Sequence, residues 1–303
     1  MLNVVGKRKI FYTLSLALIG AGIFSMIFWG LHFGIDFRGG SLIEIDFLNG
    51  RPEASAIKSK IAALDLGEAA VQPVGDNGVI IRMKDLDEAA YQKVLQSLNT
   101  LSPIEEKRFD SVGPVIGGEL KQRAYLAISL VLILIIIYIA LAFRKVSRPV
   151  ASWKYGVAAV IALFHDVSIP TGIFSILGHY FGVEIDLLFI TGLLTILGFS
   201  VHDTIVVFDR IRENLRKGMG KSFEETVNIS INQTITRSIN TSLTVFLTLL
   251  AIYIFGGAST KYFALLLMLG IFFGTYSSIF VASSILVSWE AWRQKRIARK
   301  LRH

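Results

Sequence analysis

An acidic side chain stands inside an apolar stretch of this sequence, at Asp203 in GFSVHDTIVVFDRIREN. A second acid, Asp166, lies in the apolar string ALFHDVSIP. Each acid directly follows a histidine, and a carboxylate beside an imidazole can exchange protons or bind a metal ion. Which of these chemistries applies depends on the elements that hold the two acids.

A metal-dependent hydrolase needs more ligands than the sequence offers. The remaining histidines are His32, His179 and His303, and none is placed to complete a ligand cluster. No metal site is therefore predicted. Asp166 and Asp203 can also be imagined as the pair of an intramembrane aspartyl protease. Asp203, however, follows Ser-Val-His instead of the Gly-x-Gly expected of that class, and we expect no covalent chemistry at these acids.

The elements around the acids are long and apolar. Of the 303 residues, 53% are hydrophobic and 18% charged, too few polar side chains to cover a water-soluble fold. Crossing a hydrocarbon core of roughly 30 Å takes about 20 helical residues. Six runs are long and apolar enough, within 9–36, 124–143, 155–178, 187–208, 238–254 and 262–289. We therefore predict a polytopic α-helical membrane protein with six transmembrane helices. The first run is too long for a signal peptide and lacks a small-residue cleavage site, so we expect it to remain as a helix.

Basic residues gather on one side of this six-helix arrangement. They are Lys7, Arg8 and Lys9, then Arg144, Lys145, Arg148 and Lys154, then Arg210, Arg212, Arg216, Lys217 and Lys221, and finally the tail from Arg293 to Arg302. The positive-inside rule assigns this side to the cytoplasm, with both termini. We divide the chain into 1–35 (N-terminus and first helix), 36–123 (extracytoplasmic domain), 124–290 (helices two to six) and 291–303 (basic tail).

The formal net charge of +8 is better explained by topology and lipid headgroups than by nucleic acid. No aromatic-interleaved groove or nucleic-acid motif accompanies the basic segments. The opposite side carries segment 36–123, with 14 acidic and 11 basic residues. The chain has no cysteine, so that segment must fold by its core alone.

The extracytoplasmic segment reads as a small ferredoxin-like α+β domain of order βαββαβ. SLIEIDF alternates as a strand, and ASAIKSKIAALDL has helical spacing at Ile57, Ile61 and Leu64. The strand AAVQPV, the turn GDNG and the strand VIIRM predict a hairpin. LDEAAYQKVLQSLNTL predicts a second helix and EEKRFDSVGPVIG a last strand. The domain holds no phosphate loop, histidine cluster or catalytic triad. It is either a binding or lever element or a rigid cap.

Three ionisable residues fall where the bilayer penalises charge, namely Asp166, Asp203 and Arg237. A centred charge costs about 2.5–3.5 kcal/mol on insertion scales, so each is a functional candidate. Arg237 can alternatively snorkel to the interface, and Asp203 can be a helix-end carboxylate bonded to nearby serine and threonine. If Asp203 approaches Arg237, motion of one relative to the other would switch proton affinity, because Arg stays charged. The pair would then couple protons to conformational work.

Three strings together resemble one family, the SecF subunit of the bacterial protein-export machinery, which is related to the resistance-nodulation-division transporters. GIDFRGG resembles the motif after the family's first helix, ALFHDV that of the third helix and DTIVVFDRIREN that of the fourth. The resemblance covers the whole chain. Asp36, Gly39 and Gly40 match structural positions of the first motif.

The resemblance implies a partner, SecD, and a role in late preprotein translocation across the bacterial cytoplasmic membrane, driven by the proton-motive force. SecYEG and SecA would act earlier, YajC and YidC are further candidate partners, and unfolded preprotein is the client. Protons would be the coupling ion and no other cofactor is implied. Asp203 and Arg237 match the proton path, with Thr204 a neighbour and Asp166 a third-helix match. His202 departs from the family pattern, where asparagine is expected before the Asp-Thr pair.

Two other functions stay open at the level of sequence. The chain can be a scaffold that stabilises a translocon without moving protons. It can also be a small-molecule exporter of the same superfamily, although six spans and a small external domain argue against that.

Overall fold

The structure is a computed structural model that describes residues 2–142 and 150–300. The elements are η1 (Val5–Lys7), α1 (Arg8–Phe28), α2 (Ile35–Arg38), β1 (Gly40–Phe47), α3 (Ala54–Ala62), β2 (Ala70–Val74), β3 (Gly78–Met83), α4 (Glu88–Asn99), β4 (Ile104–Val112), α5 (Pro114–Ala142), α6 (Ser152–Phe181), α7 (Leu187–Arg216), α8 (Phe223–Phe255), α9 (Ala258–Tyr276), the π-helical η2 (Ser277–Ala282) and α10 (Ser283–Lys300). The basic residues Arg144, Lys145, Arg148 and Arg302 lie outside the described residues.

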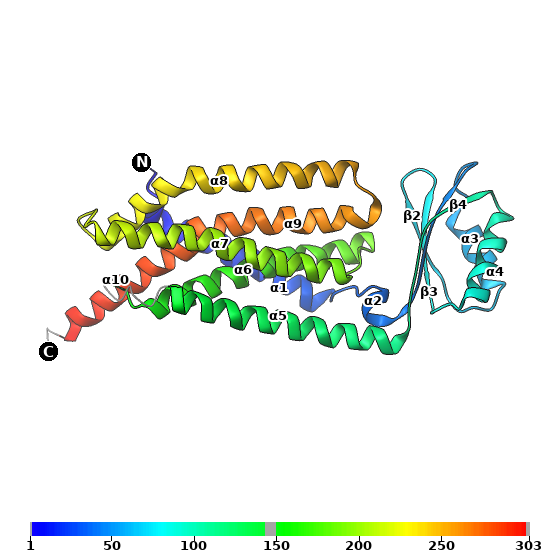
Figure 1. Ribbon diagram of the computed structural model, residues 1–303, viewed down its shortest axis with the longest axis horizontal. Helices are drawn as coiled ribbons and strands as arrows, with labels where there is room; N and C mark the ends of the chain where they lie inside the picture. Colours follow the sequence, from blue (N-terminus) through cyan, green and yellow to red (C-terminus); the bar gives the residue numbers. More distant parts are fainter. Residues whose placement is uncertain (1, 143–149, 301–303) are drawn as a thin grey trace. The chain divides into compact units, whose positions relative to one another are not determined.

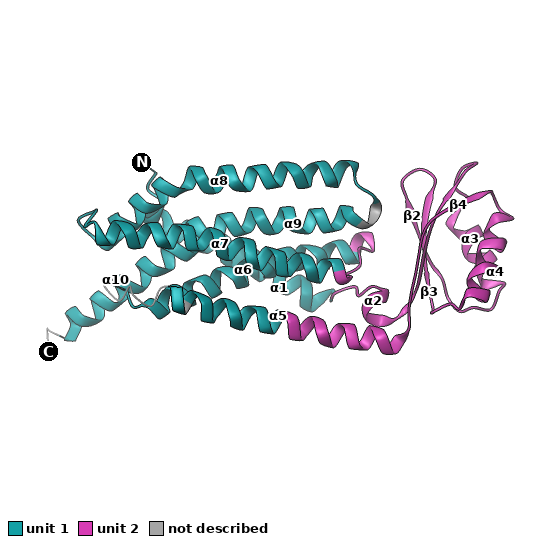
Figure 2. Cartoon of the chain, in the orientation of Figure 1, with its two compact units in different colours: residues 1–30, 128–179, 188–303 teal, residues 31–127, 180–187 magenta. Residues whose placement is uncertain are grey.

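The chain forms two compact units (Figure 2). A helical unit comprises Met1–Gly30, Ile128–His179 and Leu188–His303, and a mixed unit comprises Leu31–Ala127 and Tyr180–Leu187. The helix α5 begins in the mixed unit and continues into the helical one. The loop between α6 and α7 belongs with the sheet, although it is distant from it in sequence.

Within the described residues, six helices are long and apolar enough to cross a membrane, which confirms the predicted number of spans. They run lengthwise through the helical unit, with α8 beside α9 (Figure 1). The sixth span is continuous from Thr260 to Lys300. It passes through η2, a widened turn of a type often found at functional sites.

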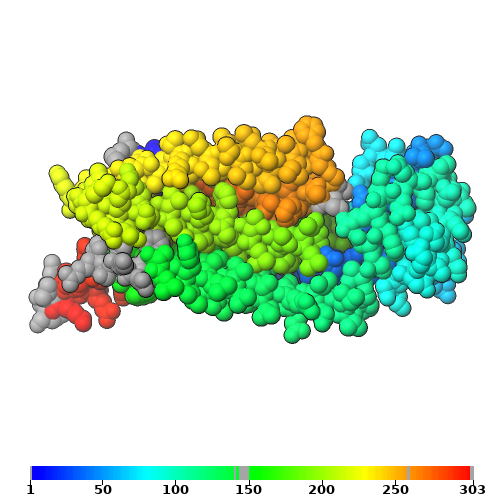
Figure 3. Space-filling view, viewed as in Figure 1, coloured from blue at the N-terminus to red at the C-terminus, as the bar shows by residue number. Residues whose placement is uncertain are grey.

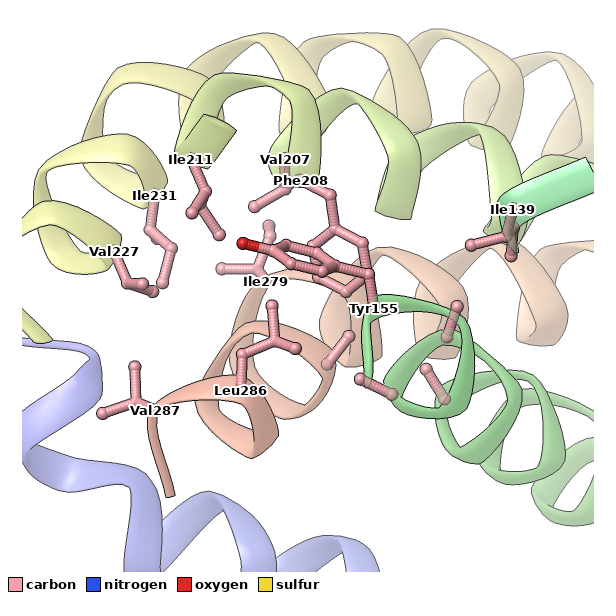
Figure 4. Close-up of a cluster of buried hydrophobic side chains, with 14 of the residues drawn as sticks. Ile139, Tyr155, Val207, Phe208, Ile211, Val227, Ile231, Ile279, Leu286 and Val287 are labelled. Carbon is pink, nitrogen blue, oxygen red and sulfur yellow. The ribbon is translucent and has the colours of Figure 1, made fainter. Parts of the chain in front are cut away.

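The core of the helical unit gathers where α6, α7, α8 and α10 meet (Figure 4). Tyr155 of α6 packs edge-on against Phe208 of α7, with ring centroids 5.2 Å apart. Val207, Ile211 and Ile231 surround them and are fully buried. This apolar cluster fixes α7 against its neighbours and so positions the acid that α7 carries.

The flanks of the helical unit are apolar and exposed. The apolar windows of α5 and α8 are each 11% buried, against 67% for α6. Side chains of α5 (green), α7 (yellow-green) and α8 (yellow) lie at the surface in the space-filling view (Figure 3). Exposed leucines and isoleucines along α8, such as Ile239, Leu243 and Leu247, suit contact with lipid or another apolar helix.

The mixed unit contains an antiparallel sheet of order β2-β3-β1-β4, covered on one face by α3 and α4 (Figure 1). The element order βαββαβ is the predicted one. Along β1 the residues Ile43, Ile45 and Phe47 are buried and the intervening ones are not, as strand alternation requires. They pack against Ile57 and Ile61 of α3, among others.

Two boundaries differ from the sequence prediction. The last strand ends at Val112, and GPVIG opens α5, since Pro114 takes the first helical position, where its missing N–H costs nothing. The helix α3 ends at Ala62, so Leu64 packs on the core from the loop that follows. That loop contains Asp65, a non-glycine residue at φ +55°.

Candidate functional site

Asp203 lies on α7 and is 9% exposed. The hydroxyl of Ser238, on α8, donates to Asp203 Oδ1 at 2.6 Å. Asp203 Oδ2 is buried and has no hydrogen-bond partner among the described residues. A buried carboxylate oxygen without a donor is rare and calls for a proton, a water molecule or a missing partner.

Hydroxyl groups continue from this acid along two directions. Thr204, next to Asp203, shares a 2.7 Å hydrogen bond with Ser278 of η2. Ser242, one turn beyond Ser238 on α8, donates to the carbonyl of Ser238 at 2.8 Å and shares a hydrogen bond with Thr275 of α9. The acid is thus embedded in hydroxyls from α7, α8, α9 and η2, with no lysine or arginine bonded to it among the described residues.

Arg237 does not pair with Asp203 in this structure. It precedes Ser238, and consecutive helical residues point about 100° apart. Ser238 is buried against α7 while Arg237 is exposed. No hydrogen bond or ion pair to Arg237 occurs within the described part of the chain. Asp203 is bonded instead to Ser238, the residue after the arginine.

Asp166 is a second, fully buried acid, on α6. Its Oδ2 accepts hydrogen bonds from Ser200 of α7 at 2.5 Å and from Ser277 of η2 at 2.8 Å. Its Oδ1 lies 2.8 Å from Nδ1 of His165. Three elements thus converge on one carboxyl group. Asp203 and Asp166 sit in separate pockets of hydroxyls that share α7 and η2.

Asp36, in the GIDFRGG segment, belongs to the mixed unit and contacts the loop between α6 and α7. Its Oδ2 accepts from the backbone N–H of Leu187 at 2.8 Å. Leu187 is the first residue of α7, so Asp36 satisfies one of the free N–H groups of that helix. The N–H of Gly34 donates to Ile185 and the N–H of Ile185 donates to His32, at 2.9 and 2.7 Å.

Gly39 and Gly40 allow the tight connection from α2 to β1. Their φ angles of +76° and +130° favour glycine. A Cβ on Gly39 would lie 2.8 Å from Cα of Pro114, and one on Gly40 would lie 2.7 Å from the carbonyl oxygen of Met83. The glycine pair therefore brings α2, β3 and the start of α5 into backbone contact.

An ion pair adds to the same region, between Arg82 of β3 and Glu184 of the α6–α7 loop, with Nε and Oε2 2.7 Å apart. Burial raises the pKa of Glu184, and the nearby Arg82 opposes that rise. Arg82 also donates to Gln72, on β2. The loop before α7 is therefore held to the sheet by an ion pair and to residues 32–34, just before α2, by backbone hydrogen bonds.

His202 is exposed on α7 and forms no hydrogen bond with Asp203 among the described residues. It therefore stands next to the acid in sequence while facing away from it. Over the same part of the chain, no group of three or more histidine, aspartate or glutamate residues gathers in a geometry that could hold a metal ion.

Comparison with known proteins places this arrangement in a family. The chain matches "Protein export membrane protein SecD/SecF, C-terminal" over residues 91–292 and the "SecD/SecF GG Motif" over residues 24–47. A "Protein translocase subunit SecF" from Thermobaculum terrenum is 48% identical, with 99% of this chain and 98% of that protein covered. The chain belongs to the SecD/SecF family.

Further members of the SecD/SecF family agree in sequence and in fold. A protein of the same printed name from Anaerolinea thermophila is 46% identical, with 97% of this chain and 96% of that protein covered. The crystal structure of SecDF from Thermus thermophilus, described as a translocon-associated membrane protein, is 33% identical with a TM-score of 0.84. That match covers 96% of this chain and 39% of the SecDF chain. The chain is thus a multi-pass membrane protein that corresponds to about two fifths of SecDF.

Sequence reasoning missed most of the hydroxyls that surround the acids. Serine and threonine near Asp203 were expected only in general terms, and none of the residues Ser200, Ser238, Ser242, Ser277 and Ser278 was singled out as a partner of an acid. The signal was present as the string GTYSS, which breaks an otherwise apolar helix. Hydroxyl groups in apolar helices need partners. The partners of these five serines are two acids, two threonines and backbone carbonyls.

Proposed function

We propose that this chain is a proton-driven accessory subunit of the Sec protein-export translocase, which pairs with SecD and promotes late steps of preprotein translocation. The observation that carries the proposal is the free oxygen of Asp203. A carboxyl group that is buried in a membrane-spanning helix, with one oxygen unpartnered, suits a group that gains and loses a proton.

Arg237 supports the pairing with a second membrane subunit. Arg237 is exposed on a membrane-spanning helix, within the polar string QTITRSINTS. A cation in that position is costly in lipid and needs an acidic partner, a wet cavity or the interface. We propose that SecD covers the exposed side of α8, so that Arg237 lies in a polar passage that also reaches Asp203. The SecDF chain, in which a SecF-like part is fused to a longer partner, supports this choice of partner.

Under this proposal the chain spans the bacterial cytoplasmic membrane with both termini in the cytoplasm. The mixed unit then lies outside and contacts the emerging preprotein, after SecYEG and SecA have begun the transfer. The basic residues near α1 and along α10 support this orientation. Asp166 and Thr204 belong to the same proton-coupling region, and protons are the coupling ion.

The test uses the chain assembled with SecD and the translocon in inverted membrane vesicles. Asp203→Asn and Arg237→Met are expected to abolish the part of preprotein export that depends on the proton gradient, while co-purification with SecD is kept. Asp209→Asn is the matched control, because Asp209 is on the same helix with a side chain 65% exposed. Export stimulation that survives collapse of the proton gradient in the wild type would favour a scaffold instead.

A further inference from the structure

The second buried acid, Asp166, is held more completely than Asp203. Both of its oxygens are engaged, one by His165 and the other by Ser200 and Ser277. The side chain is 0% exposed and His165 is 1% exposed. No lysine or arginine contacts either side chain within the described residues. The titratable groups that face the pair are Tyr276, stacked on the imidazole, and Asp203, one helical turn from Ser200.

The buried pair of His165 and Asp166 is expected to hold one proton more than a neutral imidazole beside an ionised carboxylate. An ionised carboxylate that is removed from water without a cation is strongly disfavoured. The pair becomes neutral when a single proton is added, either as an imidazolium beside a carboxylate or as an imidazole beside a carboxylic acid. Nε2 of His165 is buried and has no partner among the described residues. The imidazole therefore has one nitrogen on Asp166 and another that is open to exchange.

The hydroxyl groups around this pair lie beside Asp203 on α7, and among the described residues the Asp203 carboxyl group itself bonds only to Ser238. Ser200, Asp203 and Thr204 are spaced i, i+3 and i+4 on α7 and so lie on one face. Two consecutive serines of η2 contact residues at the two acids. Ser277 donates a hydrogen bond to Asp166, and Ser278 shares a hydrogen bond with Thr204, the residue after Asp203. Ser278 also donates to the carbonyl of Ser200 at 3.4 Å. The π-helical turn places both hydroxyls between the acids.

We propose that His165 and Asp166 form a second proton-holding site, which exchanges a proton with Asp203 through the hydroxyl groups of Ser200, Ser277, Ser278 and Thr204. This rests on the proposed function and adds an intermediate station to it. In the exchange an O–H bond at Asp203 breaks and an O–H or N–H bond at the pair forms, so Asp203 becomes the carboxylate and no electron is transferred. His165 acts as a positioning residue that shares the proton.

The test is infrared difference spectroscopy of the reconstituted complex with SecD between acidic and alkaline buffer, together with proton flux into vesicles. Two bands are expected. A carboxylic-acid carbonyl band is lost in Asp203→Asn, and a second band is lost in Asp166→Asn, which is a carbonyl band where the shared proton is on the carboxyl group and an imidazolium band where it is on His165. His165→Gln should shift the pH at which the second band disappears. Ser200→Ala with Ser277→Ala should slow proton flux about tenfold or more, the scale of a lost hydrogen bond to a charged group. Thr195→Ala is the control, because Thr195 lies on α7 and bonds only within its own helix.

The outcomes separate this inference from the proposed function. If Asp203→Asn keeps proton-driven export, the proposed function fails. If Asp203→Asn loses it while Asp166→Asn keeps both the wild-type bands and the wild-type flux, Asp166 is a structural acceptor and only the second site is overturned. Should Asp166→Asn fail to assemble with SecD, the His165→Gln and double serine variants decide, since both keep the carboxyl group. If these variants keep the wild-type infrared bands, the wild-type pH profile and the wild-type proton flux, the proposal of a second proton-holding site is also overturned.

Discussion

The helices α1 and α6 pack closely against each other at two glycines, Gly22 and Gly172. A Cβ added to Gly172 would lie 2.3 Å from Cα of Gly22, which is closer than any real contact. Hydroxyl bonds flank the crossing. Ser25 of α1 donates to the carbonyl of Gly172 at 2.9 Å, and Ser175 of α6 donates to the carbonyls of Ser25 and Gly30 at 2.9 and 2.6 Å. Close packing and hydrogen bonds are the forces that hold helices together in a membrane.

Gly172→Ala is therefore expected to destabilise the helical unit. To restore an ordinary contact near 3.4 Å, the helices must separate locally by about 1 Å. Overpacking of this kind costs about 1–3 kcal/mol, and each loosened interhelical hydrogen bond adds about 0.6 kcal/mol. The higher helix propensity of alanine compared with glycine offsets up to about 1 kcal/mol of this loss in stability. The net loss is about 1–3 kcal/mol, or roughly 5- to 150-fold in the folding equilibrium.

The matched control is Gly20→Ala, on the same helix as Gly22, where an added Cβ meets nothing within 4 Å. That variant should be neutral or slightly more stable than the wild type. The assay is reversible unfolding of the purified chain in mixed micelles, followed by steric trapping or by the circular dichroism signal. If Gly172→Ala and Gly20→Ala unfold with the same free energy as the wild type, the close contact does not support the fold and the reasoning is refuted.

Two further predictions concern the mixed unit. Gly40→Ala should lower the free energy of unfolding by about 1–3 kcal/mol, because φ is +130° at this position and the added Cβ would clash with Met83. Gly118→Ala is the control and should have no such effect, since a Cβ there has no atom within 4 Å. Equal thermal unfolding midpoints for the two variants would contradict this prediction. Because burial raises the pKa of Glu184, the folded state holds that proton more tightly than the unfolded state. The stability of the loop should therefore fall as pH rises from the unfolded value of about 4.3 through the folded value. The exchange rate of the Ile185 amide proton, corrected for the intrinsic rate at each pH, should measure this loss of stability. In Glu184→Gln the corrected rate should depend less on pH. A wild-type profile already as flat as that of the Gln variant would speak against it.

The sequence was most informative where one local signal determines the structure. Uncharged runs located the spans, and alternation in SLIEIDF located β1 and its buried face. It was least informative about partners across helices. The side chain that faces Asp203 depends on how α8 is rotated, and a rotation by one residue exchanges Ser238 for Arg237. The π-helical turn from Ser277 to Ala282 could not be predicted from the sequence either, since nothing in the residue types requires an extra residue in that turn.

The contacts around Asp36 show how the mixed unit is tied to the helix that carries Asp203. Asp36 binds the N–H of Leu187, and Arg82 binds Glu184 in the loop just before it. From Leu187 the chain continues as one helix to Arg216, and Asp203 lies about four turns along it. The covalent continuity of α7, independent of any contact between the units, makes this connection. Because α7 has no break between Leu187 and Arg216, no loop separates the segment that binds Asp36 from the turn that carries Asp203.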